Sequence, residues 1–185
     1  MNMRMSVVLF LLLCQNAVSV QAEERVFAGA VSSASPEATA AGVEILEAGG
    51  NAVDAAVAVS LALAVTEPAG SGIAGQTTMI IKRPGEKAVV VQGTTWSPRT
   101  IPADASREQL VRGRTASSVP STLRVLDKAQ RVFGSGEITW AAAMQPAIEY
   151  AENGFIVGPF RYRSFHNYLD ALREDPAAAA IFIRK

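Results

Sequence analysis

The order of apolar and polar residues first predicts a helix that begins after Ser35. A serine can cap the first turn, Pro36 suits the first helical position, and Glu37 places a negative charge at the positive end of the helix dipole. Two glycines, Gly49 and Gly50, then stop the helix. The stretch from residue 35 to residue 50 therefore carries the start and stop signals of one helix.

A second helix is predicted between Asn51 and Pro68. Asn51 is a suitable N-terminal cap, Asp54 follows it three residues later, and Pro68 ends the segment. Every position from 55 to 65 is apolar except Ser60. A helix without a polar face is normally buried, so we expect this one to lie in the core of the protein.

Beyond residue 76 the pattern changes to that of β-strands. Residues 77–82 and 87–93 are rich in β-branched and other apolar side chains, and Pro84 and Gly85 between them fit the central pair of a type II turn. These features predict a β-hairpin. The stretch from residue 98 to residue 118 is polar and has no periodicity, which predicts irregular structure.

Helical patterns return in the last third of the chain. They cover residues 121–134, 139–154 and 160–175, and a further helix is predicted to start at Pro176. Pro146 lies inside the second of these segments, where we expect it to kink or divide the helix because proline lacks the backbone N–H group.

Composition narrows the class of protein. The chain of 185 residues contains 17 Lys and Arg against 17 Asp and Glu, so its formal net charge is zero. This balance argues against a nucleic-acid-binding protein, which needs a surplus of positive charge along one face. The length fits one domain or part of a larger one.

The first 22 residues have the pattern of a signal peptide. A positive charge near the start precedes a short apolar run, and the small residues Val20 and Ala22 predict cleavage after Ala22. Lipid attachment at Cys14 is an alternative, although Leu13 is bulky for such a site. We expect an exported protein, periplasmic or extracellular, that has no disulfide and, after signal removal, no contact with a membrane.

The glycines from Gly70 to Gly75 match the spacing G-x-G-x-x-G of dinucleotide-binding loops. Such a loop needs a strand before it and a helix after it, because the helix N-terminus holds the pyrophosphate. Here a predicted helix comes first and a predicted strand follows. We therefore expect no nucleotide cofactor at this loop, and interpret the glycines as positions that permit positive φ angles and close backbone approach.

Three motifs in order resemble the γ-glutamyltransferase (γ-glutamyltranspeptidase) family near the start of its large subunit. The first comprises the sequence GGNAVDAAVA from residue 49, the sequence VTEP at residues 65–68 and the glycine loop. The others are SVPS with its helix from residue 118, and PAIEYAENGFIV at residues 146–157. The resemblance extends from about residue 30 to residue 182.

The resemblance implies an N-terminal-nucleophile hydrolase with an α+β fold, an αββα sandwich of which this chain (residues 23–185) forms only the front part. Family members are precursors that cut themselves into two subunits. The N-terminal threonine of the small subunit then transfers the acyl group of glutathione or another γ-glutamyl amide to water or an amino acid. Its partner would be the C-terminal half of the same precursor, and no metal or organic cofactor is needed.

By the same resemblance, no catalytic residue is expected in this chain, which alone should be inactive. A family arginine binds the α-carboxylate of the γ-glutamyl group, and alignment on Pro102 puts Pro98 at that position. Arg99 is then either a carboxylate ligand, shifted by one residue, or a solvated loop residue. The missing arginine keeps open a related acylase with another side-chain preference. An inactive truncated product is a further alternative, because an active enzyme must have a downstream processing threonine that this chain does not offer.

Other candidate residues have simpler interpretations. Thr77 and Thr78 are expected to serve the strand rather than to act as nucleophiles, and His166 to be an exposed helix residue. With one histidine and no cysteine after residue 22, we expect no metal cluster.

Three more side chains concern the loops and the start of the second helix. Asp54 is expected to cap the second helix, and Glu67 to accept hydrogen bonds from amides of the glycine loop. Trp96 is expected to be a packed aromatic, with a pocket wall as the alternative.

Overall fold

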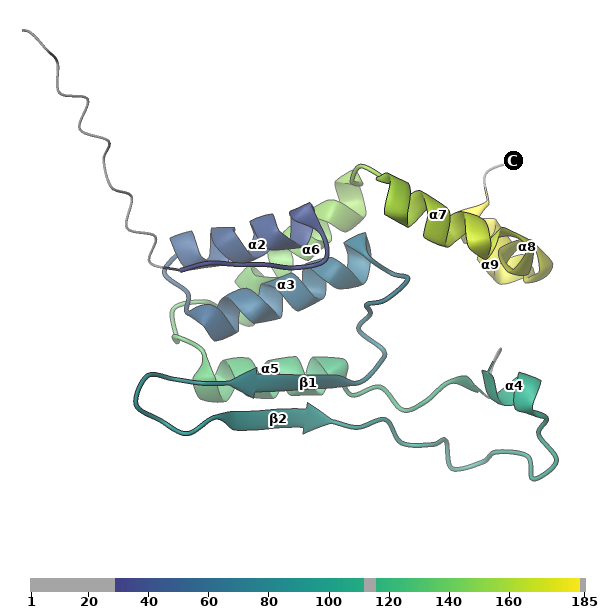
Figure 1. The fold of residues 1–185 in the computed structure, drawn as a ribbon, viewed down its shortest axis with the longest axis horizontal. Helices are drawn as coiled ribbons and strands as arrows, with labels where there is room; N and C mark the ends of the chain where they lie inside the picture. The colour runs from purple at the N-terminus through teal and green to yellow at the C-terminus, as the bar shows by residue number, and fades with distance from the viewer. Residues whose placement is uncertain (1–28, 112–115, 184–185) are drawn as a thin grey trace, which may run out of the picture.

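The computed structural model describes residues 29–111 and 116–183, so the predicted signal peptide at residues 1–22 lies outside the described part. Figure 1 shows a helical layer above a two-stranded hairpin. The elements are α2 (Pro36–Glu47), α3 (Ala52–Thr66), β1 (Thr77–Ile81), β2 (Val89–Gly93), α4 (Arg107–Val111), α5 (Thr122–Phe133), α6 (Trp140–Asn153), α7 (Pro159–Asn167), α8 (Leu169–Glu174) and α9 (Pro176–Phe182). The mixture of helices with a small sheet agrees with the expected α+β class.

The predicted starts of α2 and α3 are confirmed by their hydrogen bonds. The Ser35 hydroxyl accepts the N–H of Ala38 at 3.1 Å. The Asn51 side chain accepts the N–H groups of Val53 and Asp54, and the carboxylate of Asp54 accepts the N–H of Asn51 at 3.0 Å. This reciprocal capping box satisfies amides that a helix end leaves without partners.

Helix α3 lies at the centre of the fold, as its apolar sequence predicts. It packs against α2, α6 and α5, and in Figure 1 it lies between the upper helices and the hairpin. Its most deeply buried apolar residues are Ala55, Val57, Ala58, Leu61 and Ala62. The cover is incomplete, because Ala56, Val59 and Ser60 on another side of the helix remain half-buried.

The predicted hairpin is present. Strands β1 and β2 pair antiparallel, with Thr77 opposite Gly93 and Ile81 opposite Val89. Gly85 in the turn has a φ of 75°, a conformation that glycine adopts without strain. Helix α5 packs on one face of the hairpin, where a second apolar cluster contains Val53, Ile81, Val91, Val125 and Ala129.

The C-terminal helices differ from the prediction at two places. Helix α6 runs through Pro146 without division, so the expected division is wrong; Pro146 and Ala147 are both buried against the core. The segment predicted as one helix from residue 160 to residue 175 is instead split into α7 and α8 at Tyr168, whose N–H bonds the carbonyl of Phe165 in a tight turn.

A short helix, α4, occupies part of the segment predicted to be irregular. Its start carries a capping signal: the Ser106 hydroxyl accepts the N–H of Gln109, and the Gln109 side chain accepts the N–H of Ser106 at 2.8 Å. A serine followed three residues later by glutamine is a recognised start signal, so the sequence contained the information for this helix.

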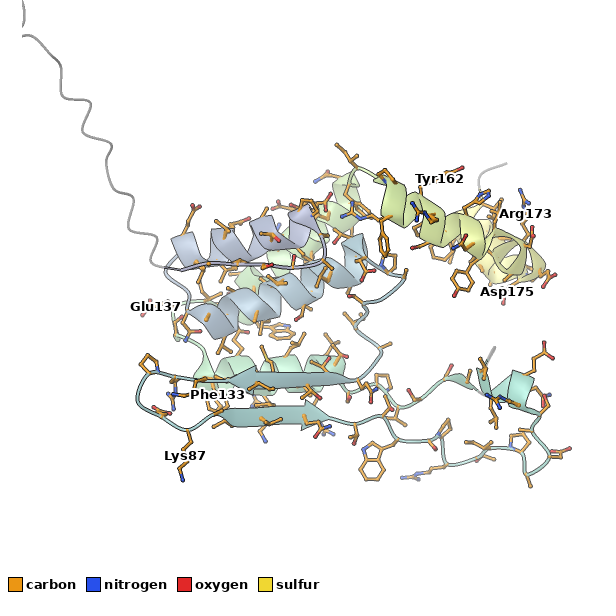
Figure 2. The ribbon with its side chains drawn as sticks, viewed as in Figure 1. Lys87, Phe133, Glu137, Tyr162, Arg173 and Asp175 are labelled. Carbon is orange, nitrogen blue, oxygen red and sulfur yellow. The ribbon has the colours of Figure 1, made fainter. Side chains whose placement is uncertain are left out.

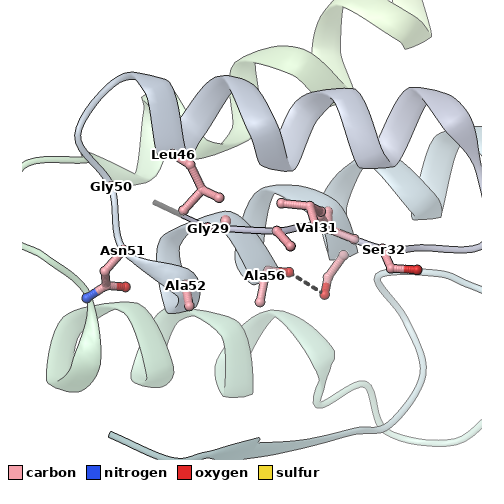
Figure 3. Close-up of a pocket in the computed structure, with 12 residues that line it drawn as sticks. Gly29, Val31, Ser32, Leu46, Gly50, Asn51, Ala52 and Ala56 are labelled. Atoms are coloured by element: carbon pink, nitrogen blue, oxygen red, sulfur yellow. Dashed lines mark hydrogen bonds between the residues drawn. The ribbon is translucent and has the colours of Figure 1, made fainter. Parts of the chain in front are cut away.

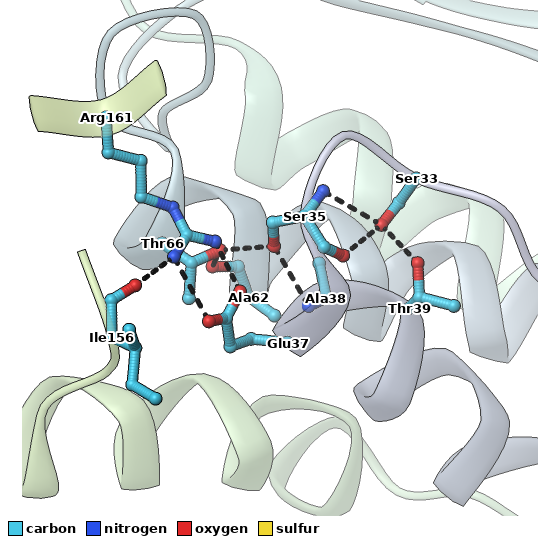
Figure 4. Close-up of polar contacts among 9 residues, drawn as sticks. All are labelled: Ser33, Ser35, Glu37, Ala38, Thr39, Ala62, Thr66, Ile156 and Arg161. Carbon is cyan, nitrogen blue, oxygen red and sulfur yellow. Dashed lines mark hydrogen bonds and ion pairs between the residues drawn. The ribbon is translucent and has the colours of Figure 1, made fainter. Parts of the chain in front are cut away.

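A shielded ion pair joins α7 to α2 (Figure 4). The guanidinium of Arg161 donates to both carboxylate oxygens of Glu37, and also to the carbonyl of Ile156 at 2.6 Å. The side chains are only 10% and 17% exposed, and Arg161 lies over the ring of Phe155 at 5.0 Å. The hydrogen bond from Arg161 lowers the pKa of Glu37. The pair connects residues 124 positions apart in sequence.

A buried carboxylate joins α3 to the connection between α5 and α6. Asp54 is fully buried and accepts the N–H of Ser135 at 2.8 Å and the side-chain amide of Gln130 at 3.4 Å. Burial alone would raise the pKa of Asp54, but hydrogen bonds from Ser135, Asn51 and Gln130 outweigh it and leave the pKa below its ordinary value. The expected capping role is confirmed, and this second role is added to it.

Replacing Arg161 with methionine should release α7 from α2, because Glu37 would remain as a shielded charge without its cation. We expect a loss of about 2–4 kcal/mol in the free energy of unfolding, measured by urea denaturation. Arg173→Met is the matched control, since Arg173 forms an exposed pair with Asp170 on the adjoining helix, and should cost less than about 1 kcal/mol. Equal effects of the two variants would contradict the assigned role of Arg161.

Replacing Asp54 with asparagine should cost about 2–4 kcal/mol, because an amide cannot accept all the N–H groups that the carboxylate accepts. The cost should depend on pH. A lowered folded-state pKa means that the carboxylate stabilises the protein fully above its unfolded pKa of about 3.9, and that this stabilisation is lost as pH falls through the folded value. Urea denaturation should therefore show the two proteins converging in acid; a difference independent of pH would contradict this account.

Candidate functional site

The loop between α3 and β1 carries the glycine motif and is held at its start by Glu67. The carbonyl of Glu67 accepts the N–H groups of Gly70 and Ser71 at 3.2 and 3.0 Å. The carboxylate of Glu67 accepts the hydroxyl of Ser71 at 3.0 Å. The expectation that this side chain would bind the loop amides is therefore wrong: the backbone carbonyl binds them, because it already points into the turn that ends the helix.

The other end of the loop is tied to helix α5. The carbonyl of Gly75 accepts the N–H groups of Ser121 and Thr122 at 3.0 and 3.2 Å, which satisfies the first amides of that helix. The hydroxyl of Ser121 donates to the carbonyl of Gly93 at 2.9 Å, at the end of β2. The loop, the start of α5 and the end of the hairpin thus meet at one point.

A hollow with a volume of about 500 Å³ opens beside this loop. Its walls come from α3, from the loop, from the start of β1 and from the start of α5. The lining residues are Ser60, Leu63, Pro68, Ala69, Gly70, Ser71, Gly72, Gly75, Gln76, Thr77 and Thr122. Hydroxyl groups, a side-chain amide and loop backbone face it, so it can hold a small polar group through neutral hydrogen bonds.

The residues that line the hollow include no nucleophile with a neighbouring base to activate it. The hydroxyl of Thr77 donates to the hydroxyl of Thr122 at 2.9 Å, and Thr77 begins β1, so the expected strand role of this residue is confirmed. His166 lies on α7, is exposed as expected, and stacks on Tyr162, which Figure 2 labels on the same helix, with ring centres 5.7 Å apart. Within the described residues, no group of three or more potential ligands could hold a metal ion.

The φ angles of Gly70, Gly72 and Gly75 are not positive. The prediction that these glycines permit positive φ angles in the loop is therefore wrong. A Cβ atom at Gly70 would lie 2.9 Å from a carboxylate oxygen of Glu67, which is the far end of a flexible side chain. The space around Gly72 is open, with no atom within 4 Å of such a Cβ. Neither position therefore shows a strict steric need for glycine.

Arg99, the candidate carboxylate ligand, lies exposed on the irregular segment after β2. It is not among the residues that line the hollow. Trp96, three residues earlier, is 72% exposed, so the expectation that it packs in the interior is wrong. Its carbonyl accepts the N–H of Val119 at 2.9 Å in an isolated antiparallel bridge.

None of the helices in the described part is both long enough and apolar enough to cross a membrane.

Three aromatic side chains in the helical layer are partly buried: Trp140 and Tyr150 pack against the main apolar cluster, and Phe155 lies under Arg161. These aromatics serve packing.

Comparison with known proteins identifies what the chain resembles. A sequence model described as Gamma-glutamyltranspeptidase matches residues 38–185. The Acylase ACY 1 proenzyme of Pseudomonas sp. (strain V22) is 35% identical over 170 residues, which cover 84% of this chain. The glutathione hydrolase proenzyme of Escherichia coli (strain K12) is 34% identical over 155 residues, which cover 76% of it.

The fold agrees with these similarities. The crystal structure of the Helicobacter pylori gamma-glutamyltranspeptidase superposes with a TM-score of 0.77 and 26% sequence identity. The superposition covers 85% of this chain and 47% of that one. The chain spans 30% of the length of the acylase proenzyme and 26% of the length of the E. coli hydrolase.

Gly93→Ala should disrupt the junction at which the loop, α5 and β2 meet. A Cβ atom at Gly93 would lie 2.6 Å from Cγ2 of Val125 and 2.8 Å from Cβ of Ser121, so α5 would have to move away from β2. We expect a loss of about 1–3 kcal/mol in urea denaturation. Gly72→Ala is the control, because its Cβ would meet open space, and should change stability by less than about 0.5 kcal/mol. A tolerated Gly93→Ala would refute this close approach.

Proposed function

Because the chain belongs to the gamma-glutamyltranspeptidase family, we propose that it forms the N-terminal part of the large subunit of an acyl-transfer enzyme. The proposed donor is glutathione or a related γ-glutamyl amide, and the acceptor is water or an amino acid. The observation that carries the proposal is the match from residue 38 to residue 185, supported by the superposition on a gamma-glutamyltranspeptidase at a TM-score of 0.77.

In this proposal the nucleophile is a threonine that follows this chain in the complete precursor. Self-cleavage would make it the first residue of the small subunit, and its own α-amine, with a pKa of about 8, would take the hydroxyl proton. Attack of the hydroxyl oxygen on the γ-glutamyl carbonyl forms an ester with the enzyme and releases the amine. Two features support this division of labour: the relatives named as proenzymes, and a hollow lined with neutral hydrogen-bonding groups.

The chain's own contribution in this proposal is to shape one wall of the acyl-transfer site. Helices α3 and α5 hold the two ends of the glycine loop through Glu67 and Ser121. The loop then presents its backbone beside the hollow. A wall of this kind positions an acyl chain and excludes water, while the covalent chemistry takes place on the other subunit.

An acylase with another side-chain preference is the second candidate. Two observations favour it: Pro98 stands where the resemblance implies a carboxylate-binding arginine, and an acylase proenzyme is 35% identical to this chain. Arg99 bears on this choice, because a γ-glutamyl or other acidic acyl group gives its guanidinium a carboxylate to bind, whereas an apolar acyl group does not.

We further propose that residues 1–22 direct export and that the mature protein is periplasmic or extracellular. The positively charged start, the apolar run and the small residues at Val20 and Ala22 support this reading. Mass spectrometry of the protein from the culture or periplasm should then give a chain that begins at Glu23.

The acyl preference can be measured on the complete processed enzyme with three para-nitroanilides: γ-glutamyl, glutaryl and butyryl. The first two carry the distal carboxylate and the third does not. If Arg99 binds that carboxylate, Arg99→Ala should raise KM about tenfold or more for the first two substrates and leave the butyryl substrate unchanged. Arg107→Ala, an exposed arginine in the next helix, should change none of the three.

Two results would count against this account. Equal KM values for wild type and Arg99→Ala on the γ-glutamyl substrate would show that Arg99 does not bind the substrate carboxylate. A kcat/KM for the butyryl substrate above that for the γ-glutamyl substrate would favour the acylase.

A further inference from the structure

Four hydroxyl groups line the hollow beside the glycine loop, and two of them donate their hydrogens to atoms outside the lining. The hydroxyl of Ser60 donates to the carbonyl of Ala56 at 2.8 Å, on a part of α3 that also lines a neighbouring groove (Figure 3). The hydroxyl of Ser71 donates to the carboxylate of Glu67 at 3.0 Å. The oxygen atoms of Ser60 and Ser71 can therefore accept a hydrogen bond from a ligand, but neither hydroxyl has a hydrogen left to donate.

The other two hydroxyl groups leave one hydrogen without an acceptor. The hydroxyl of Thr77 donates to the hydroxyl oxygen of Thr122 at 2.9 Å. The hydroxyl of Thr122 donates to no atom of the described residues, although this residue is only 4% exposed. Buried hydroxyl groups normally have a partner for each hydrogen. Because Thr122 lines the hollow, its hydrogen is available to a ligand that lies there.

The side-chain amide of Gln76 adds a second free polar group to the hollow. This side chain lines the hollow, is exposed, and makes no hydrogen bond to another residue in the described part of the chain. It carries two N–H donors and one carbonyl acceptor. Together with the donor on Thr122 and the acceptor on Ser71, it gives the hollow uncharged groups that both donate and accept.

The charges around the hollow limit what it can hold. Its lining residues include no Asp, Glu, Lys, Arg or His. The carboxylate of Glu67 lies directly behind the wall, bonded to the hydroxyl of Ser71. A carboxylate ligand would be repelled by this like charge and would find no cation in the lining to offset its desolvation. An ammonium ligand has no lone pair to accept the hydrogen of Thr122. An amide is uncharged and carries a carbonyl oxygen and an N–H group on separate atoms, so it complements both kinds of group in the wall.

We propose that this hollow binds an uncharged amide group of the substrate. The amide oxygen accepts the hydroxyl hydrogen of Thr122, and the amide N–H donates to Ser71 or to the side chain of Gln76. The inference rests on the proposed function, because it treats the hollow as one wall of the acyl-transfer site. The amide belongs to the acyl group or to the amine on the other side of the scissile bond, and the chemistry of recognition is the same for both. Thr122 and Gln76 then determine specificity for it.

Binding to the complete protein tests the site without catalysis. Glycylglycine and 5-aminopentanoate represent the amine side and differ only in that the first has an amide where the second has two methylene groups. Glutaramate and hexanoate are the corresponding pair for the acyl side. In at least one pair, calorimetric titration should show the amide compound binding about threefold to tenfold more tightly, the gain expected from an uncharged hydrogen bond. The pair with the preference identifies the side of the scissile bond. Equal affinities within both pairs would overturn the proposal.

Variants assign the preference to the hollow. Thr122→Val removes the hydroxyl and keeps the shape of the side chain, so it should abolish the preference for the amide compound, whereas Thr122→Ser should retain it. Thr78→Val is the matched control, because Thr78 is exposed on the same strand as Thr77 and does not line the hollow. If Thr122→Val does not fold, Gln76→Leu at an exposed position takes its place and should reduce the preference. A preference unchanged in the folded variant would overturn the proposal.

Failure of the proposed function gives a different result from failure of this site. A complete protein that shows the amide preference and its dependence on Thr122, yet transfers no acyl group, would refute the proposed function and sustain the amide site. A protein that transfers acyl groups but binds both members of each pair equally would refute the amide site and leave the proposed function in place.

Discussion

The burial of helix α3 is the constraint on which the other elements depend. Its sequence from Ala55 to Val65 offers a single polar side chain, so water is a poor neighbour on every side. Helices α2 and α6 cover it from one direction, and α5 with the hairpin from another. The cover is not complete in the described part of the chain, because Ala56, Val59 and Ser60 remain half-buried.

Burial alone does not fix where α3 lies along its axis. Polar contacts at both ends of the helix do. At its start, Asp54 accepts N–H groups from its own cap and from Ser135, which fixes the helix against the connection from α5 to α6. At its end, the hydroxyls of Thr66 and Ser35 bond at 2.8 Å, and Glu67 begins the glycine loop. The apolar middle of the helix supplies stability, and the polar ends determine where the loop and its hollow lie.

The sequence predicted the features that depend on near neighbours. The caps at Ser35 and Asn51 and the turn at Gly85 follow from residues a few positions apart, and all three were found. The helical stretches were found as well, except that residues 160–175 form two helices instead of one. Features that depend on distant residues were missed. The ion pair between Glu37 and Arg161 joins residues 124 positions apart, and no local pattern links the two.

The exposed position of Trp96 and the continuity of α6 through a proline are likewise set by tertiary packing. For the candidate site, the glycine loop was located from the order of elements around it. The role of Ser121 in holding the loop was not predicted, because its partners, Gly75 and Gly93, lie 46 and 28 residues away in the sequence.

The mass of the complete precursor after purification tests the central claim most directly. The account predicts two associated products whose masses add up to that of the precursor without its leader, with a threonine as the first residue of the C-terminal product. Replacing that threonine with alanine should leave one intact chain. A precursor that transfers acyl groups without being cut, or that is cut before another residue, would contradict the claim that this chain serves a self-processing N-terminal-nucleophile enzyme.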